Sequence, residues 1–138
     1  MKFSDIPSSK WEQLKPYLDT CLLPITGLTG GEPPYEATHA LEQLRDLMDL
    51  IEIPFKGRVV TYPACHYVDA GGGTDMLDKL CTAIRTIGFR HIIVVTVSSE
   101  LSPHSGADLW ISPGEDGLLP EAGSVSNAVQ ALWNGLGA

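Results

Sequence analysis

A glycine-rich segment near the start of the chain has the composition of a ligand-binding loop. Residues 26–31 read Thr-Gly-Leu-Thr-Gly-Gly, after the apolar run 22–25 and before Glu32 and two prolines. Neither the P-loop pattern GxxxxGK[ST] nor the dinucleotide pattern GxGxxG is present, and the carboxylates of Glu32 and Glu36 would repel a phosphate. The segment therefore predicts either a simple turn or a small-molecule loop. Its candidate binding residues are Thr26, Thr29, Gly30, Gly31 and Glu32.

A second candidate site lies at "YPACHY", where Cys65 stands beside His66. Adjacent residues on extended backbone point to opposite faces, so these two do not form a ready Cys–His dyad. Cys65 could still use His39 or His104 from a neighbouring loop as its base. The simpler alternative is that Cys65 is a buried structural thiol and that His66 binds a ligand.

The four histidines do not have the spacing of a metal site. His39, His66, His91 and His104 form no HxH, HxxxH or HExxH pattern. Glu36-x-x-His39 would place two ligands on one helix face, but di-iron helical bundles use two such motifs and this chain has one. We therefore expect no bound metal and no cofactor.

Polar residues also follow the most apolar run of the chain, "HIIVVTV". Ser98, Ser99 and Glu100 come next. No GxSxG elbow surrounds them, which argues against a nucleophilic serine. We expect their side chains to hydrogen-bond a small ligand or the start of a helix.

Alternating helix and strand patterns must position these residues. Apolar runs predict strands at 20–25, 58–63, 91–97 and 108–112, and apolar residues at helical spacing predict helices at 35–52 and 74–87. Ser9-x-x-Glu12 predicts a capped helix whose buried face includes Trp11, Leu14 and Leu18, and Ser124 predicts the cap of a last helix. We expect Leu41 on the buried face of the helix at 35–52 and Ile87 on the buried face of the helix at 74–87.

This alternation predicts an α/β fold in three layers, α/β/α. We expect about four mainly parallel strands with helices on both faces, a Rossmann-like core and a single domain over residues 1–138. Ligands of such sheets bind outside the carboxyl ends of the strands. The loops expected there are 26–35, 64–73, 98–106 and 112–123.

Composition excludes several classes of partner. The 138 residues carry a formal net charge of −8, and the nine basic residues are scattered. Binding to nucleic acid or to an anionic membrane surface is therefore disfavoured. Three widely spaced cysteines suit a reducing compartment. The first residues lack the apolar core of a signal peptide, and no apolar run approaches the ~20 residues of a membrane span. We expect a soluble cytoplasmic protein.

Two stretches resemble the creatininase (creatinine amidohydrolase) family. "DTCLLPITGLTGGEPPYEATHA" is similar to that family's V-L-P-V-G-S-T-E-Q-H-G-P-H segment, and "GFRHIIVVTVSSE" to its G-F-R-R-I-V strand and N-G-H-G-G-N loop. Aligned on that pattern, the family's glutamate ligand falls on Thr29, its histidine ligand on Gly31 and its aspartate ligand near Ala40. The resemblance implies a creatininase-like core whose metal ligands are missing.

A resemblance over the whole length is to the YpiF-like family of uncharacterised proteins from Gram-positive spore-formers. It rests on "YLDTCLLPI", "FKGRVVTYPACHY" and "GFRHIIVVT" in that order, and it implies a cytoplasmic bacterial protein.

Three functional hypotheses follow from the sequence. The favoured one is a non-catalytic domain that binds a small ligand or a protein partner through its strand-end loops, or assembles with itself. The alternative is a small amidohydrolase-like enzyme using Glu32, Cys65 or His66 and the Ser98–Glu100 loop. The third is a structural subunit whose Trp110, Leu118 and Leu119 form an apolar patch.

Overall fold

The computed structural model describes residues 1–68, 73–98, 101 and 106–135. Its elements alternate along the chain as the sequence predicts. They are a 3-10 turn at Phe3–Asp5, α1 Ser8–Leu14, β1 Thr20–Ile25, α2 Pro34–Glu52, β2 Val59–Thr61, α3 Gly73–Ile87, β3 His91–Thr96, β4 Leu109–Ile111 and α4 Ala122–Trp133.

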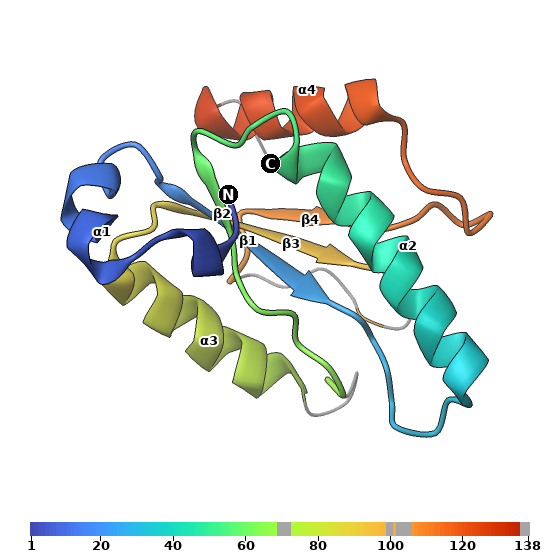
Figure 1. The fold of residues 1–138 in the computed structure, drawn as a ribbon. Helices are drawn as coiled ribbons and strands as arrows, with labels where there is room; N and C mark the ends of the chain where they lie inside the picture. The colour runs from blue at the N-terminus through green and yellow to red at the C-terminus, as the bar shows by residue number, and fades with distance from the viewer. Residues whose placement is uncertain (69–72, 99–100, 102–105, 136–138) are drawn as a thin grey trace.

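The four strands form one sheet in the order β2-β1-β3-β4, and every pairing is parallel. The central strand β1 pairs along its whole length with β3, from Thr20 opposite His91 to Ile25 opposite Thr96. Helices cover both faces, α2 and α4 on one and α1 and α3 on the other (Figure 1). The predicted three-layer α/β fold is confirmed, and its sheet is wholly rather than mainly parallel in the described residues.

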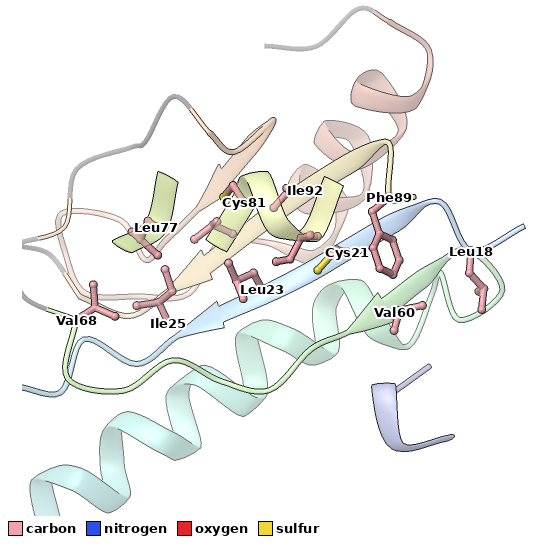
Figure 2. Close-up of a cluster of buried hydrophobic side chains, with 12 residues drawn as sticks. Leu18, Cys21, Leu23, Ile25, Val60, Val68, Leu77, Cys81, Phe89 and Ile92 are labelled. Carbon is pink, nitrogen blue, oxygen red and sulfur yellow. The ribbon is translucent and has the colours of Figure 1, made fainter. Parts of the chain in front are cut away.

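Strand alternation sends neighbouring residues to opposite layers. In β1, Cys21, Leu23 and Ile25 face the α3 layer, where they pack with Leu77 and other buried side chains (Figure 2). Leu22 faces the α2 and α4 layer. Both faces of β1 are buried, which explains why its sequence is a continuous apolar run.

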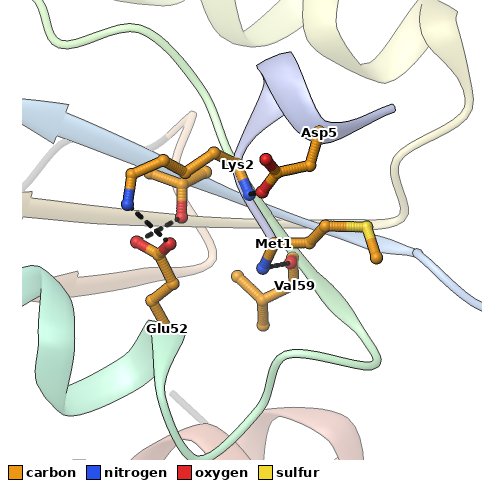
Figure 3. A network of polar contacts seen from close by, with 6 residues as sticks. Met1, Lys2, Asp5, Glu52 and Val59 are labelled. Atoms are coloured by element: carbon orange, nitrogen blue, oxygen red, sulfur yellow. Dashed lines mark hydrogen bonds and ion pairs between the residues drawn. The ribbon is translucent and has the colours of Figure 1, made fainter. Parts of the chain in front are cut away.

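The first two residues extend the sheet beyond β2. Lys2 forms a parallel bridge with Thr61, and the Thr61 N–H donates to the Met1 carbonyl at 2.8 Å. The Lys2 ammonium lies 3.1 Å from Glu52 of α2, whose other carboxylate oxygen accepts the Thr61 hydroxyl at 3.2 Å (Figure 3). These contacts cover an edge strand and supply partners for the buried Glu52 carboxylate.

A polar network fixes the amino ends of the strands. Arg58 donates from Nε and Nη2 to the two carboxylate oxygens of Asp19, at 2.9 and 3.1 Å. Its guanidinium also lies 4.1 Å from the ring centroid of Trp133, in the last turn of α4. The Trp133 indole N–H donates to the Thr20 hydroxyl at 2.8 Å. The network therefore joins α4 to β1.

Several predicted details of the helices are wrong. Helix α1 begins at Ser8 after Pro7, so Ser9 is no cap. It ends at Leu14 because Pro16 has no N–H for a helical bond, and Leu18 is buried beyond the helix. Helix α4 begins at Ala122, which places Ser124 inside it.

Two residues of the predicted inward stripes are exposed. Leu41 is 45% exposed, because the first turns of α2 extend past the ends of the strands (Figure 1). Ile87, at the end of α3, is 38% exposed. Among the described residues, no helix is long and apolar enough to cross a membrane.

Candidate functional site

The two central strands end in the same way, each with a buried threonine that folds the following turn. The Thr26 hydroxyl accepts the Leu28 N–H at 3.4 Å, and the Thr96 hydroxyl accepts the Ser98 N–H at 3.1 Å. Such hydroxyl-to-backbone bonds favour a local turn over continuation of the strand. The segments after β1 and β3 therefore turn at the same carboxyl edge of the sheet.

Gly27 allows these two turns to touch. It has a φ of +75°, and a β-carbon built on it would lie 2.3 Å from Ser98 Cβ. Since real side chains never approach so closely, only glycine fits at this point. The loops after β1 and β3 are thus held together at the position where α/β sheets bind ligands.

The segment after β2 runs back along β1 and delivers His66. The Cys65 N–H donates to the Pro24 carbonyl at 2.8 Å, and the Cys65 carbonyl accepts the Thr26 N–H at 3.0 Å. His66 Nδ1 then lies 3.0 Å from the Thr26 hydroxyl, which is 3.3 Å from the Cys65 carbonyl. If His66 is protonated on Nδ1, each of these atoms has a hydrogen-bond partner. The His66 Nδ1–H then donates to the Thr26 hydroxyl, and the Thr26 hydroxyl donates to the Cys65 carbonyl.

The Cys65 thiol has the properties of a structural group. Burial raises its pKa, and within the described part of the chain no hydrogen bond joins it to a histidine or carboxylate. Its side chain packs against the α3-side core. Thiolate chemistry requires a lowered pKa, and the described residues place no group beside Cys65 that would lower it.

Glu32 is used to close its own loop. Its Oε1 accepts the Thr29 N–H and hydroxyl, both at 2.6 Å, and its Oε2 accepts the Gly30 N–H at 3.1 Å. The hydroxyl bond from Thr29, followed by the backbone bonds, lowers the pKa of Glu32 to about 2. These three hydrogen bonds stabilise the ionised form of the Glu32 carboxylate.

An open cleft of about 540 Å³ lies between this loop, the end of β3 and the first turns of α2. Its size is within the usual range of small-molecule sites. The lining residues are Thr26, Gly27, Leu28, Thr29, Glu32, Tyr35, Glu36, His39, Ala40, Gln43, Val97 and Ser98.

The cleft gathers part of the predicted site. Thr26, Thr29, Glu32 and Ser98 line it, and His66 contacts it indirectly through Thr26. Gly30 and Gly31 belong to the loop that Glu32 and Thr29 close. Ser99, Glu100 and His104 lie outside the described residues.

The sequence analysis missed the contribution of α2. Tyr35 and Gln43 line the cleft, and so do Glu36 and His39, neither of which had been named as a ligand-binding residue. Residues 36, 39, 40 and 43 recur at the spacing of one helix face, so the pattern was present in the sequence. Among the described residues, no three His, Cys, Asp or Glu side chains form a group that could hold a metal.

Comparison with known protein families assigns the chain to one family. Residues 9–112 match the family described as "Protein of unknown function (DUF2487)". The chain belongs to this family. The DUF2487 match includes all four strands and ends just after β4, before α4. No curated protein and no solved structure matches the chain significantly.

Proposed function

We propose that this DUF2487 protein is a cytoplasmic, non-catalytic domain that binds a small ligand in the cleft at the carboxyl edge of its sheet. The observation that supports the proposal is the cleft itself, whose lining includes Gly27 from the loop after β1 and Ser98 from the loop after β3. In sheets of this kind the junction where strand order reverses is the usual ligand site. Here β1 connects to β2 on one side, and the chain then crosses to β3 on the other.

The chemistry of the surrounding groups favours binding over hydrolysis. Glu32 accepts three hydrogen bonds from its own loop, and His66 Nδ1 faces a threonine hydroxyl rather than the Cys65 thiol. A hydrolase needs a nucleophile, a base and a group that orients the base within hydrogen-bond reach. The described residues support a preformed cavity with polar walls, which is sufficient for binding.

The resemblance to creatininases belongs to the same proposal. On that alignment Thr29 and Gly31 occupy the positions of two metal ligands, and both take part in the loop that Glu32 closes. We propose that the scaffold descends from a metal-site architecture in which a hydrogen-bonded loop now replaces the ion.

The test is a fragment screen read by amide chemical shifts of the ¹⁵N-labelled protein. We expect bound fragments to shift the amides of Thr26, Gly27 and Ser98. Replacing Ala40 in the cleft wall by tryptophan should abolish these shifts, while Glu42→Trp, on an exposed position of the same helix outside the cleft, should leave them intact. A screen without such shifts, or shifts that survive Ala40→Trp, would refute the proposal.

A further inference from the structure

The cleft continues beyond the site described above. A second hollow, of about 420 Å³, lies between the end of β3 and the loop after β4. It shares Gln43, Val97 and Ser98 with the first cleft. The two hollows therefore form one groove across the carboxyl edge of the sheet, from the glycine-rich loop to the segment 112–117.

The two ends of this groove are acidic. Glu32 and Glu36 lie at the α2 end, and Glu115 lies at the β4 end. Among the described residues that line the groove, His39 is the only basic side chain, and the chain as a whole carries a net charge of −8.

The lining of the groove is not only acidic. The two hollows also include the apolar side chains of Leu28, Ala40, Val97, Leu101 and Pro113. Gln43 lies where the two hollows meet and offers both donors and an acceptor. Acidic ends, joined by a lining that combines apolar side chains with the Gln43 amide, suit a ligand whose cationic groups are linked by methylene segments.

We propose that the groove binds a linear polyamine, with its terminal ammonium groups at the two acidic ends, its methylene segments along the apolar lining and its internal ammonium donating to the amide oxygen of Gln43. The inference rests on the proposed function of the cleft and names the class of its ligand. Ammonium–carboxylate hydrogen bonds would hold the ends. Tyr35, which is 73% exposed at the α2 end, offers an aromatic face to the cation there.

Spermidine is the probe, compared with two ligands of similar length, the neutral 1,8-octanediol and the dianion suberate. We expect spermidine to shift amides at both ends of the groove, near Thr29 and near Gly117, and to bind more weakly as salt rises. Glu36→Gln and Glu115→Gln should each weaken binding about twofold to fivefold, as expected for exposed charge pairs. Glu42→Gln is the matched control and should leave the affinity unchanged, because Glu42 lies outside the groove.

The results distinguish this inference from the proposed function. If octanediol or suberate shifts the cleft amides and spermidine does not, the ligand class is wrong and the binding site stands. If spermidine shifts one end alone, or if Glu42→Gln weakens binding as much as Glu36→Gln, the groove does not recognise a polyamine. If no compound, including the fragments, shifts the cleft amides, the proposed function fails as well.

Discussion

Gly27 lies so close to Ser98 that no side chain fits between the loop after β1 and the loop after β3. A β-carbon on Gly27 would lie 2.3 Å from Ser98 Cβ and 3.2 Å from Ser98 Cα. Rotation of the Ser98 side chain about χ1 moves neither its Cα nor its Cβ, so a change of rotamer would relieve neither contact. The candidate site therefore depends on the absence of a single side chain.

The first prediction concerns Gly27→Ala. The alanine meets a positive φ, which costs about 1–2 kcal/mol, and a clash with Ser98, which adds about 1–3 kcal/mol. Urea unfolding should show the summed loss of stability, and the Ser98 amide should shift as the loops separate. Gly117→Ala is the control, because Gly117 has a φ of +77° and open space around its missing β-carbon. Equal losses in the two variants would show that the loops do not touch.

The second prediction concerns the pKa of Glu32. Because hydrogen bonds to the Thr29 hydroxyl and to backbone N–H groups lower it to about 2, Thr29→Val should raise it part of the way toward the ordinary glutamate value. Glu32 stabilises the fold above its unfolded pKa, and this contribution is lost as the pH falls toward 2. Carboxyl ¹³C titration by NMR measures the pKa directly.

Thr38→Val is the control for this titration. The Thr38 hydroxyl donates to the Pro34 carbonyl and to no carboxylate, so the pKa of Glu32 should stay unchanged. If Glu32 titrates alike in the native protein and in Thr29→Val, the carboxylate does not close the loop.

The strands could be predicted because they depend on patterns that the sequence displays. Strand β1 was predicted at its observed bounds, Thr20–Ile25, since burial on both faces requires a continuous apolar run. A parallel sheet then places the loops after all its strands at one edge, but the sequence does not specify that β1 and β3 are neighbours in that sheet.

The chemical state of the site could not be predicted in this way. The three bonds to Glu32 depend on the backbone path of its loop, where Gly30 has a φ of +98°, and sequence spacing does not specify that path. The bond between Thr26 and His66 joins residues forty positions apart, through the return of the chain after β2. The predictions that Ser9 and Ser124 cap helices were wrong for a related reason. The helices begin earlier than the capping residues suggest, at Ser8 and Ala122, because the path of the preceding chain determines where each helix starts.

The third prediction tests the hydrolase alternative at Cys65. Since burial raises the pKa of its thiol, iodoacetamide at pH 8 should label Cys65 far more slowly in the native protein than in urea. Peptide mapping by mass spectrometry separates it from Cys21, whose pKa burial also raises. Cys65→Ser should leave the fragment-induced amide shifts unchanged. If Cys65 is labelled at the rate of the unfolded chain, or faster, its thiol is activated, and this result would support the hydrolase hypothesis.

The fourth prediction concerns Arg58, which connects β1 with α4. Arg58→Lys keeps the charge but loses the two-pronged contact with Asp19 and the planar stacking on Trp133. Because the Arg58 side chain is 40% exposed, solvent screens part of the contribution, and we expect a loss of about 1–2 kcal/mol in the free energy of unfolding. Arg45→Lys, in the exposed pair with Asp46, should change stability by less than about 0.5 kcal/mol.

Acid unfolding provides a second measure of the same contact. Burial raises the pKa of Asp19, but the hydrogen bonds from Arg58 and Thr20 outweigh it, so the net pKa is lowered. Asp19 therefore stabilises the fold above its unfolded pKa, and the contribution is lost as the pH falls below that value. Arg58→Lys should reduce this acid-dependent component and raise the pH at which unfolding begins, whereas Arg45→Lys should not. An unchanged acid transition in Arg58→Lys would mean that Asp19 does not rely on the guanidinium, and that α4 is held by the Trp133 bond to Thr20 and by its apolar face alone.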